Sequence, residues 1–271
     1  MKRYSALLGI TLVVCSVGLA QDANSERVVV PARDTTHARK VDVSLLGGSI
    51  TVKSYTGKEV IVEASAGASV KPGKAVPDKA ADGMRRLDLR PRGLSVEEEN
   101  NVVTVRMRRL QRAELVISVP PDTSLKLHTL HGEIAVEGVK GELDISSLNG
   151  KIALTNVSGS VLANTMNGAM KVTMDSVDPN KPLSFSSMNG AIDVTLPADF
   201  KANVKLRTDH GEIYSDFDFK LGAGAVTEKN DTPDGRFRVK MDRTITGTIN
   251  GGGTEAAFKT YNGTIYLRKK K

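Results

Sequence analysis

The chain has 271 residues, a formal net charge of +7 at pH 7, one Cys and no Trp. A single Cys excludes an internal disulfide framework, and an aromatic content of 4% argues against a platform for stacking nucleic-acid bases or sugars. We therefore expect no nucleic-acid partner. The length allows one large domain or two small ones with a sizeable buried core.

The first twenty residues have the pattern of a secretory signal peptide. Lys2 and Arg3 precede an apolar stretch at 6–19, and a small residue, Ala20, stands before Gln21. A retained membrane anchor is the alternative, but the stretch is about 14 residues long and a spanning helix needs ~20. We expect residues 1–20 to be removed, which leaves no Cys and no transmembrane segment. The exported chain would be periplasmic, at the cell surface or secreted.

The N-terminal β region, residues 21–120, alternates apolar and polar residues in short segments. This two-residue period is typical of half-buried strands. It occurs in VDVSLLGGSITV (41–52), EVIVEAS (59–65), VVTVRM (102–107) and ELVISV (114–119). Residues 67–86 have no such period and are expected to form an exposed loop.

Residues 121–271 are predicted to form a β-repeat solenoid because glycines recur at a fixed spacing. Nine residues separate Gly132, Gly141, Gly150, Gly159 and Gly168. Apolar residues stand two, four and seven positions after each of the first four Gly, and the first two alternate as in a strand with one buried face. The residue before Gly changes from His131 to Lys140 to Asn149, so the true repeat is eighteen residues with two strands.

Later copies keep the pattern at a looser spacing. After Asn167-Gly168 they include Asn189-Gly190, His210-Gly211, Asn250-Gly251 and Asn262-Gly263, with an insert at 175–182. The charged stretch 220–242 is expected to be a lid, a long hairpin or a mobile loop. The basic tail 268–271 is expected to be a solvated, frayed terminus, with contact to anionic lipid, polymer or nucleic acid as the alternative.

Two architectures are compatible with these repeats. Asn-Gly between apolar runs is the strongest hairpin signal and favours an antiparallel meander or sandwich. However, the alternate corners lack a turn signature, and the residue seven positions after each Gly is apolar just before a corner. A β-solenoid of 18-residue coils around one apolar interior explains both features and is our prediction. In it, Met188, Ile192 and Val194 face the core.

The corner residues invite a proposal of metal binding, which we do not favour. His131 and His210 stand where other copies carry Asn, and both residue types tolerate a left-handed backbone, so we interpret all of these as structural turn positions. The carboxylates of Glu97, Glu98 and Glu99, or of Asp193 and Asp199, are the nearest to a catalytic group, but turns and edges explain them. We therefore predict no catalytic, cofactor or metal site, and no enzyme.

The segment LHGEIAVEGVKGELDISSLNGKIALTNVSGSVLANTMNGAMKV (130–172), with LLGGSITV and TYNGTIYLRKK, resembles the bacterial putative-adhesin β-strand-repeat family, a domain of unknown function. It is akin to the head-GIN putative autotransporter adhesins. The resemblance covers about residues 41–268 and implies an exported envelope protein, and it brings no active-site residues.

The expected function is that of a non-catalytic binding or scaffold module of the cell envelope. Its partner would be an envelope protein or a surface polymer, with self-association through exposed strand edges as a further option. Two other hypotheses are a carbohydrate-active enzyme built on a β-helix and a domain that senses envelope stress.

Overall fold

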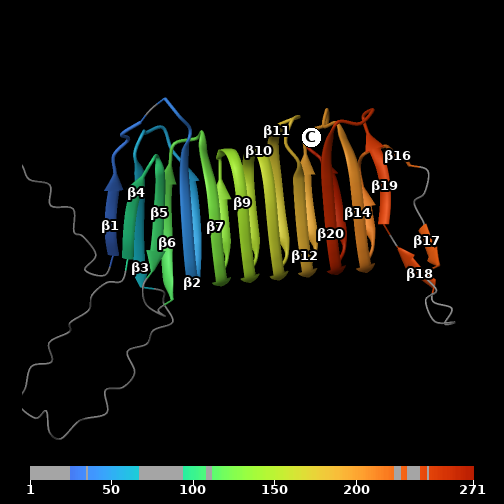
Figure 1. Ribbon diagram of the computed structural model, residues 1–271, viewed down its shortest axis with the longest axis horizontal. Helices are drawn as coiled ribbons and strands as arrows, with labels where there is room; N and C mark the ends of the chain where they lie inside the picture. The colour runs from blue at the N-terminus through green and yellow to red at the C-terminus, as the bar shows by residue number, and fades with distance from the viewer. Residues whose placement is uncertain are drawn as a thin grey trace, which may run out of the picture.

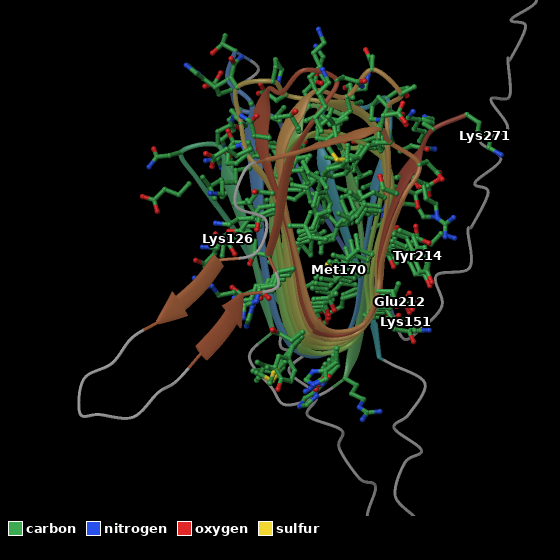
Figure 2. All side chains as sticks on the ribbon, turned by 90° about the vertical axis from the view of Figure 1, so that its right-hand side faces the viewer. Lys126, Lys151, Met170, Glu212, Tyr214 and Lys271 are labelled. Carbon is green, nitrogen blue, oxygen red and sulfur yellow. The ribbon has the colours of Figure 1, made fainter. Side chains whose placement is uncertain are left out.

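The computed structural model describes residues 25–34, 36–66, 94–107, 112–222, 227–230, 239–242 and 244–271; the predicted loop 67–86 lies outside these ranges. The described residues form strands without any helix, and so contain no helix able to cross a membrane. The strands lie side by side along one long axis (Figure 1). Seen from the end, they form two facing sheets, A and B, that meet at a rounded corner (Figure 2). Lys126 points outward from sheet A, Tyr214 points outward from sheet B, and Met170 lies between the sheets.

Each sheet contains strands from distant parts of the chain. Sheet A has the order β4 (Leu94–Glu99), β5 (Val102–Met107), the first part of β2 (Arg39–Ser54), β7 (Thr123–His131), β9 (Lys140–Asn149), the second part of β10 (Ile152–Asn167), β12 (Leu183–Asn189), β20 (Thr254–Asn262), β14 (Ala202–His210), β19 (Thr244–Ile249) and β16 (Phe219–Leu221). Sheet B has the order β1 (Ser25–Val30), β3 (Val60–Ala66), β6 (Ala113–Val119), the second part of β2, β8 (Ile134–Glu137), the first part of β10, β11 (Met170–Val177), β13 (Ile192–Leu196), β21 (Ile265–Lys269) and β15 (Ile213–Ser215). β2 and β10 bend round a corner and belong to both sheets.

The pairing of the central strands is parallel, which confirms the β-solenoid and excludes the antiparallel meander there. Ile134 pairs with Ile152, and Ile152 pairs with Met170, so equivalent residues are eighteen apart. Met170 then pairs with Ile192, and the four surplus residues fall in the predicted insert. Sheet B thus receives one strand from each coil, and sheet A receives the other.

The order of the coils in the stack differs from the order in the chain at both ends. Ile192 pairs with Ile265, and Ile265 pairs in turn with Ile213. The coil of β20 and β21 therefore lies between the coil of β12 and β13 and the coil of β14 and β15, although it comes last in the chain. At the other end, β2 lies between the coil of β5 and β6 and that of β7 and β8. The stack therefore contains strands from both regions that were distinguished in the sequence, residues 21–120 and residues 121–271. Antiparallel strands flank it, with β4 and β3 at one end and β19 at the other.

The apolar interior lies between the sheets, as the two-residue alternation predicts. Ile192 and Val194 are fully buried, as expected, and Phe185 stacks on Phe258 with ring centroids 5.2 Å apart. The prediction that Met188 faces the core is wrong, because its relative exposure is 49%. Sheet A stays regular up to the Asn of the corner, so the residue before this Asn falls on the outward side.

At the alternate corners, the apolar residue seven positions after the Gly is buried. The residue before it has a left-handed backbone, which interrupts the alternation of inward and outward side chains. Gly138 and Asn156 have φ angles of 71° and 52°, and they directly precede Val139 and Val157, both fully buried. The pair Asn250-Gly251, expected to be a coil corner, is instead the turn between β19 and β20, where Asn250 has a φ of 49°.

The C-terminal segments are more ordered than the sequence predicts. The expectation of a frayed basic tail is wrong, because β21 is paired on both sides and Arg268 Nε lies 2.8 Å from Asp193 Oδ1. Lys270 Nζ lies 2.7 Å from Asp175 Oδ1. Within the stretch 220–242, the described residues include the antiparallel pair β17 (Thr227–Asn230) and β18 (Val239–Asp242).

Candidate functional site: the outer surface of sheet A

The corners between sheets A and B carry a ladder of Asn side chains. Each amide nitrogen donates to the amide oxygen of the next coil: Asn167 to Asn149, Asn189 to Asn167 and Asn262 to Asn189, each at 2.8 Å. Asn149 Nδ2 lies 3.2 Å from His131 Nδ1 at one end, and His210 pairs in register with Asn262 at the other. Five coil spacings of ~4.8 Å place these two His about 24 Å apart, so they cannot share a metal ion.

The expectation that Asn and His are placed here by a left-handed backbone is wrong. Among the described residues, positive φ angles outside Gly occur at Asn100, Asn101, Asn156 and Asn250, none of which belongs to the ladder. The hydrogen bonds between coils account for the recurrent Asn instead. Such bonds exist only when identical residues stack at the same register.

The Gly after each ladder residue is required by the close approach of neighbouring coils. A Cβ at Gly150 would lie 1.7 Å from the carbonyl oxygen of Gly132, and a Cβ at Gly168 would lie 2.0 Å from that of Gly150. Gly132, Gly190, Gly211 and Gly263 have the same kind of contact. At the alternate corners, Cβ atoms at Gly141 and Gly159 would lie 2.7 Å and 2.3 Å from carbonyl oxygens.

A buried hydroxyl three residues before these Gly positions completes the corner, and sequence reasoning missed it. Thr165 Oγ1 donates to the carbonyl of Gly150 at 3.2 Å, and Ser187 Oγ donates to that of Gly168 at 3.2 Å. Ser147, Thr260 and Thr208 make the equivalent bond. The signal was present, since Ser or Thr stands at this position in TLHG, SLNG, TMNG and TYNG.

Because the hydroxyl points inward and the ladder amide lies at the corner, the side chain between them points outward. These side chains form what we call the apolar stripe, which crosses six coils: Leu46, Leu130, Leu148, Met166, Met188 and Tyr261. Met166 and Tyr261 are each 46% exposed, whereas Leu130 and Leu148 are half-buried. The last coil carries Asp209 at this position.

Beside the stripe, a row of polar side chains forms the floor of a groove of about 540 Å³. This polar row consists of Ser44, His128, Ser146, Asn164, Ser186, Lys259 and Arg207, and all but Ser44 line the groove. Its three central members are small and uncharged. The charges lie at one end, where Arg207 Nη2 lies 3.3 Å from Asp209 Oδ1.

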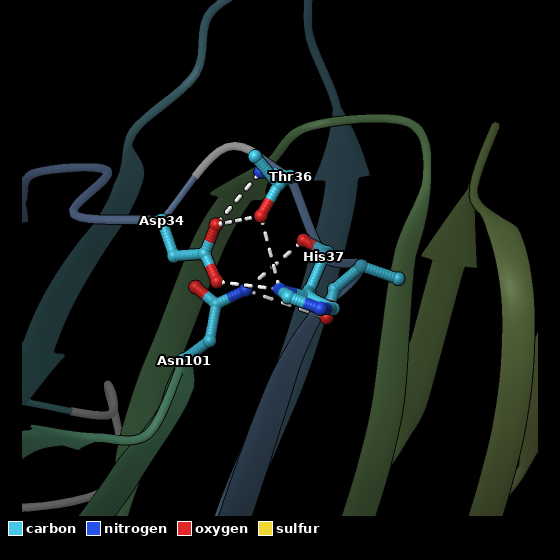
Figure 3. A network of polar contacts seen from close by, with 5 residues as sticks. Asp34, Thr36, His37 and Asn101 are labelled. Carbon is cyan, nitrogen blue, oxygen red and sulfur yellow. Dashed lines mark hydrogen bonds and ion pairs between the residues drawn. The ribbon is translucent and has the colours of Figure 1, made fainter.

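A second polar cluster lies in the loop between β1 and β2 (Figure 3). Asp34 accepts hydrogen bonds from the Thr36 hydroxyl and backbone NH, at 2.6 Å and 2.7 Å, and lies 2.7 Å from His37 Nδ1. The Thr36 hydroxyl, then His37, hold the pKa of the Asp34 carboxyl well below its usual range. Asn101 Nδ2 donates to the His37 carbonyl at 3.0 Å, which ties this loop to the turn between β4 and β5.

Three of the five carboxylates considered from the sequence have structural partners, and one of them, Glu97, accepts a hydrogen bond from the Ser95 hydroxyl at 2.9 Å. Glu98 Oε2 lies 3.2 Å from Arg33 Nε, and its Oε1 lies 3.9 Å from Nη2 of the buried Arg39. Asp193 pairs with Arg268 on sheet B, away from Asp199 in the exposed turn after β13. Within the described part of the chain, no three His, Cys, Asp or Glu side chains gather as a metal site.

Parallel 18-residue coils with an Asn ladder at one corner define the molecule as a β-solenoid. The chain belongs to the Toastrack DUF4097 family, whose model matches residues 18–265, and this confirms the expected membership in a β-repeat family of unknown function. No curated protein matches it.

The solved structures that are similar to the chain include the following three. A putative cell adhesion protein from Clostridium sporogenes is 11% identical, with a TM-score of 0.45 over 91% of this chain and 99% of that one. A putative adhesin from Bacteroides fragilis is 8% identical, with a TM-score of 0.32 over 92% and 98%. A putative adhesin from Parabacteroides merdae is 8% identical, with a TM-score of 0.22 over 91% and 97%.

Proposed function

We propose that the protein is an exported, non-catalytic binding module of the cell envelope and that the outer surface of sheet A is its binding surface. The observation that carries this proposal is the apolar stripe, most of which lines the groove. Five of the nine large hydrophobic side chains exposed in the described residues lie on this surface: Leu46, Leu162, Met166, Met188 and Tyr261. A contiguous exposed apolar patch with a polar border is typical of an interaction site.

The structure offers fewer grounds for binding at sheet B. Its exposed aromatic residue, Tyr214, stacks on Tyr266 at 5.5 Å between ring centroids, and Arg268 lies over the Tyr266 ring at 5.2 Å. Tyr214 also donates a hydrogen bond to Glu212, which raises the pKa of its hydroxyl. These groups therefore already have partners within the chain.

Binding can be tested by co-sedimentation of purified residues 21–271 with envelopes isolated from the producing cells. We expect the wild-type chain to sediment and a Met166→Glu, Met188→Glu variant to stay in the supernatant, because two carboxylates interrupt the apolar stripe. Thr173→Glu, Thr195→Glu is the matched control, since these residues are neighbours on the outer side of sheet B. Equal sedimentation of all three proteins, or of none, contradicts the proposal.

The non-catalytic and exported parts of the proposal have separate tests. Incubation with a panel of envelope and plant polysaccharides should release no product, and any product refutes the non-catalytic assignment. Expression of the full chain should yield, outside the cytoplasm, a protein whose first residue is Gln21. An intact N-terminus on a cytoplasmic protein would refute export.

A further inference from the structure

We propose that the occupant of sheet A is a second copy of this chain, packed face to face with its solenoid axis antiparallel to that of the first. This inference rests on the proposed function in taking sheet A as the binding surface. It adds the identity of the partner and the direction of packing.

The surface has the composition of an interface, with an uncharged centre and charged ends. A third row of outward residues, the mixed row, runs beside the polar row: Asp42, Lys126, Asp144, Leu162, Ser184, Ala257 and Lys205. The central coil is that of the second part of β10, and its outward residues in the three rows are Leu162, Asn164 and Met166. Across this coil and its two neighbours, Asp144 is the only charged residue in the three rows. Depletion of charge at the centre and a polar rim are typical of protein interfaces.

Consider a twofold axis parallel to the second part of β10, the central strand of the surface. It would place each row of one copy opposite the same row of the partner, with the coils in reverse order. Met166 then meets the partner's Met166, Leu148 meets the partner's Met188, and Leu130 meets the partner's Tyr261. At the rim, Asp42 lies opposite the partner's Lys205. Five of the six residues of the apolar stripe therefore meet stripe residues of the partner, and Leu46, at the rim, lies opposite the partner's Asp209.

Charge disfavours the parallel arrangement of the two solenoids. There, equivalent coils face each other, and the end that carries Lys205, Arg207 and Lys259, whose charge is only partly offset by Asp209, meets the same end of the partner. Like charges brought together at an interface disfavour association. The antiparallel arrangement separates the two cationic ends by the length of the stack.

The surface is large enough for a specific dimer. Seven coils at ~4.8 Å and three rows at ~6.7 Å give a patch of roughly 700 Å² on each copy. The total of about 1,400 Å² lies within the ~1,200–2,000 Å² of specific interfaces. Packed sheets keep their strand directions within about 30° of each other, and a twofold axis along the central strand satisfies this condition. Pairing through strand edges would use shorter strands, since β15 and β16 have three residues each at one end of the stack and β1 and β4 have six each at the other.

Cysteine cross-linking tests both the surface and the direction, because the only Cys of the chain, Cys15, is absent from residues 21–271. Packed sheets lie ~10 Å apart, so a short bis-maleimide is the suitable reagent. We expect Met166→Cys to give a covalent dimer. Leu148→Cys and Met188→Cys should each give little dimer alone and a strong dimer when mixed. Thr173→Cys, on sheet B, is the control and should stay monomeric.

Each contrary result has a distinct meaning. A monomer in sedimentation equilibrium at about 100 µM, or equal cross-linking of Thr173→Cys, overturns the proposal. Self-linking of Leu148→Cys as strong as that of Met166→Cys refutes the antiparallel direction. If the chain is monomeric but still binds envelopes through Met166 and Met188, the proposed function stands and this inference fails. If the chain forms this dimer but binds no envelope, this inference stands and the proposed function fails.

Discussion

Replacement of Gly168 by Ala tests whether close stacking of coils, and not backbone conformation, explains the recurrent Gly. The new Cβ would lie 2.0 Å from the Gly150 carbonyl oxygen, whereas ordinary contacts begin at 3.4 Å. The clash is with backbone, which cannot move aside unless the two coils separate. Separation by more than 1 Å would break the hydrogen bonds that join the coils at this corner.

Four such bonds cross between the two coils at this corner. They are Gly150 N to Asn167 O at 3.0 Å, Ile152 N to Ala169 O at 3.1 Å, Thr165 Oγ1 to Gly150 O at 3.2 Å and Asn167 Nδ2 to Asn149 Oδ1 at 2.8 Å. At about 1 kcal/mol each, their loss lowers the free energy of unfolding by about 4 kcal/mol. For a chain of this size the melting temperature should fall by roughly 8–16 °C.

The control is Gly251→Ala, at a position that needs Gly for a different reason. Gly251 has a φ of 89°, and no atom lies within 4 Å of the position that a Cβ would occupy there. Ala therefore introduces backbone strain of about 1–2 kcal/mol without a clash. Urea unfolding of both variants, followed by far-ultraviolet circular dichroism, measures the difference. If Gly168→Ala destabilises no more than Gly251→Ala does, the close-stacking argument is refuted.

Three further predictions concern the ladder, the core and the polar cluster. Asn167→Ala removes two ladder bonds and should lower the free energy of unfolding by about 1–2 kcal/mol in urea melts; no change would show that the exposed ladder adds nothing to stability. Phe258→Ala should cost about 3–5 kcal/mol by the same assay, because the ring is fully buried and stacked, and a loss below 1 kcal/mol would contradict this packing. Asp34 should still be ionised near pH 3 by carbon NMR, and Thr36→Val should raise its pKa; an ordinary pKa in the wild-type chain would contradict the contacts. Since folding lowers this pKa, the stabilisation from Asp34 is present above its unfolded pKa of ~3.9 and is lost as the pH falls towards the folded value.

The candidate site was only partly visible in the sequence. The words TLHG, SLNG, TMNG and TYNG contain the hydroxyl residue, the outward apolar residue, the ladder residue and the Gly, and the polar-row residue directly precedes each word. The outward direction of Met188 was predicted wrongly because the two kinds of corner were treated as equivalent. They differ at Gly138 and Asn156, whose positive φ angles turn the following Val inward.

The sequence by itself determined the fold class, the 18-residue coil and the inward residues of each strand. These properties are local, because alternation sets the buried side of a strand and a fixed repeat sets the length of a coil. The tertiary structure alone decided which coils are neighbours. Successive coils present similar edges and the same corner residues, so no local signal shows that the coil of Ile265 enters between those of Ile192 and Ile213. The Asn ladder and the apolar stripe depend on that order, since both are formed by residues that meet only when the coils are stacked.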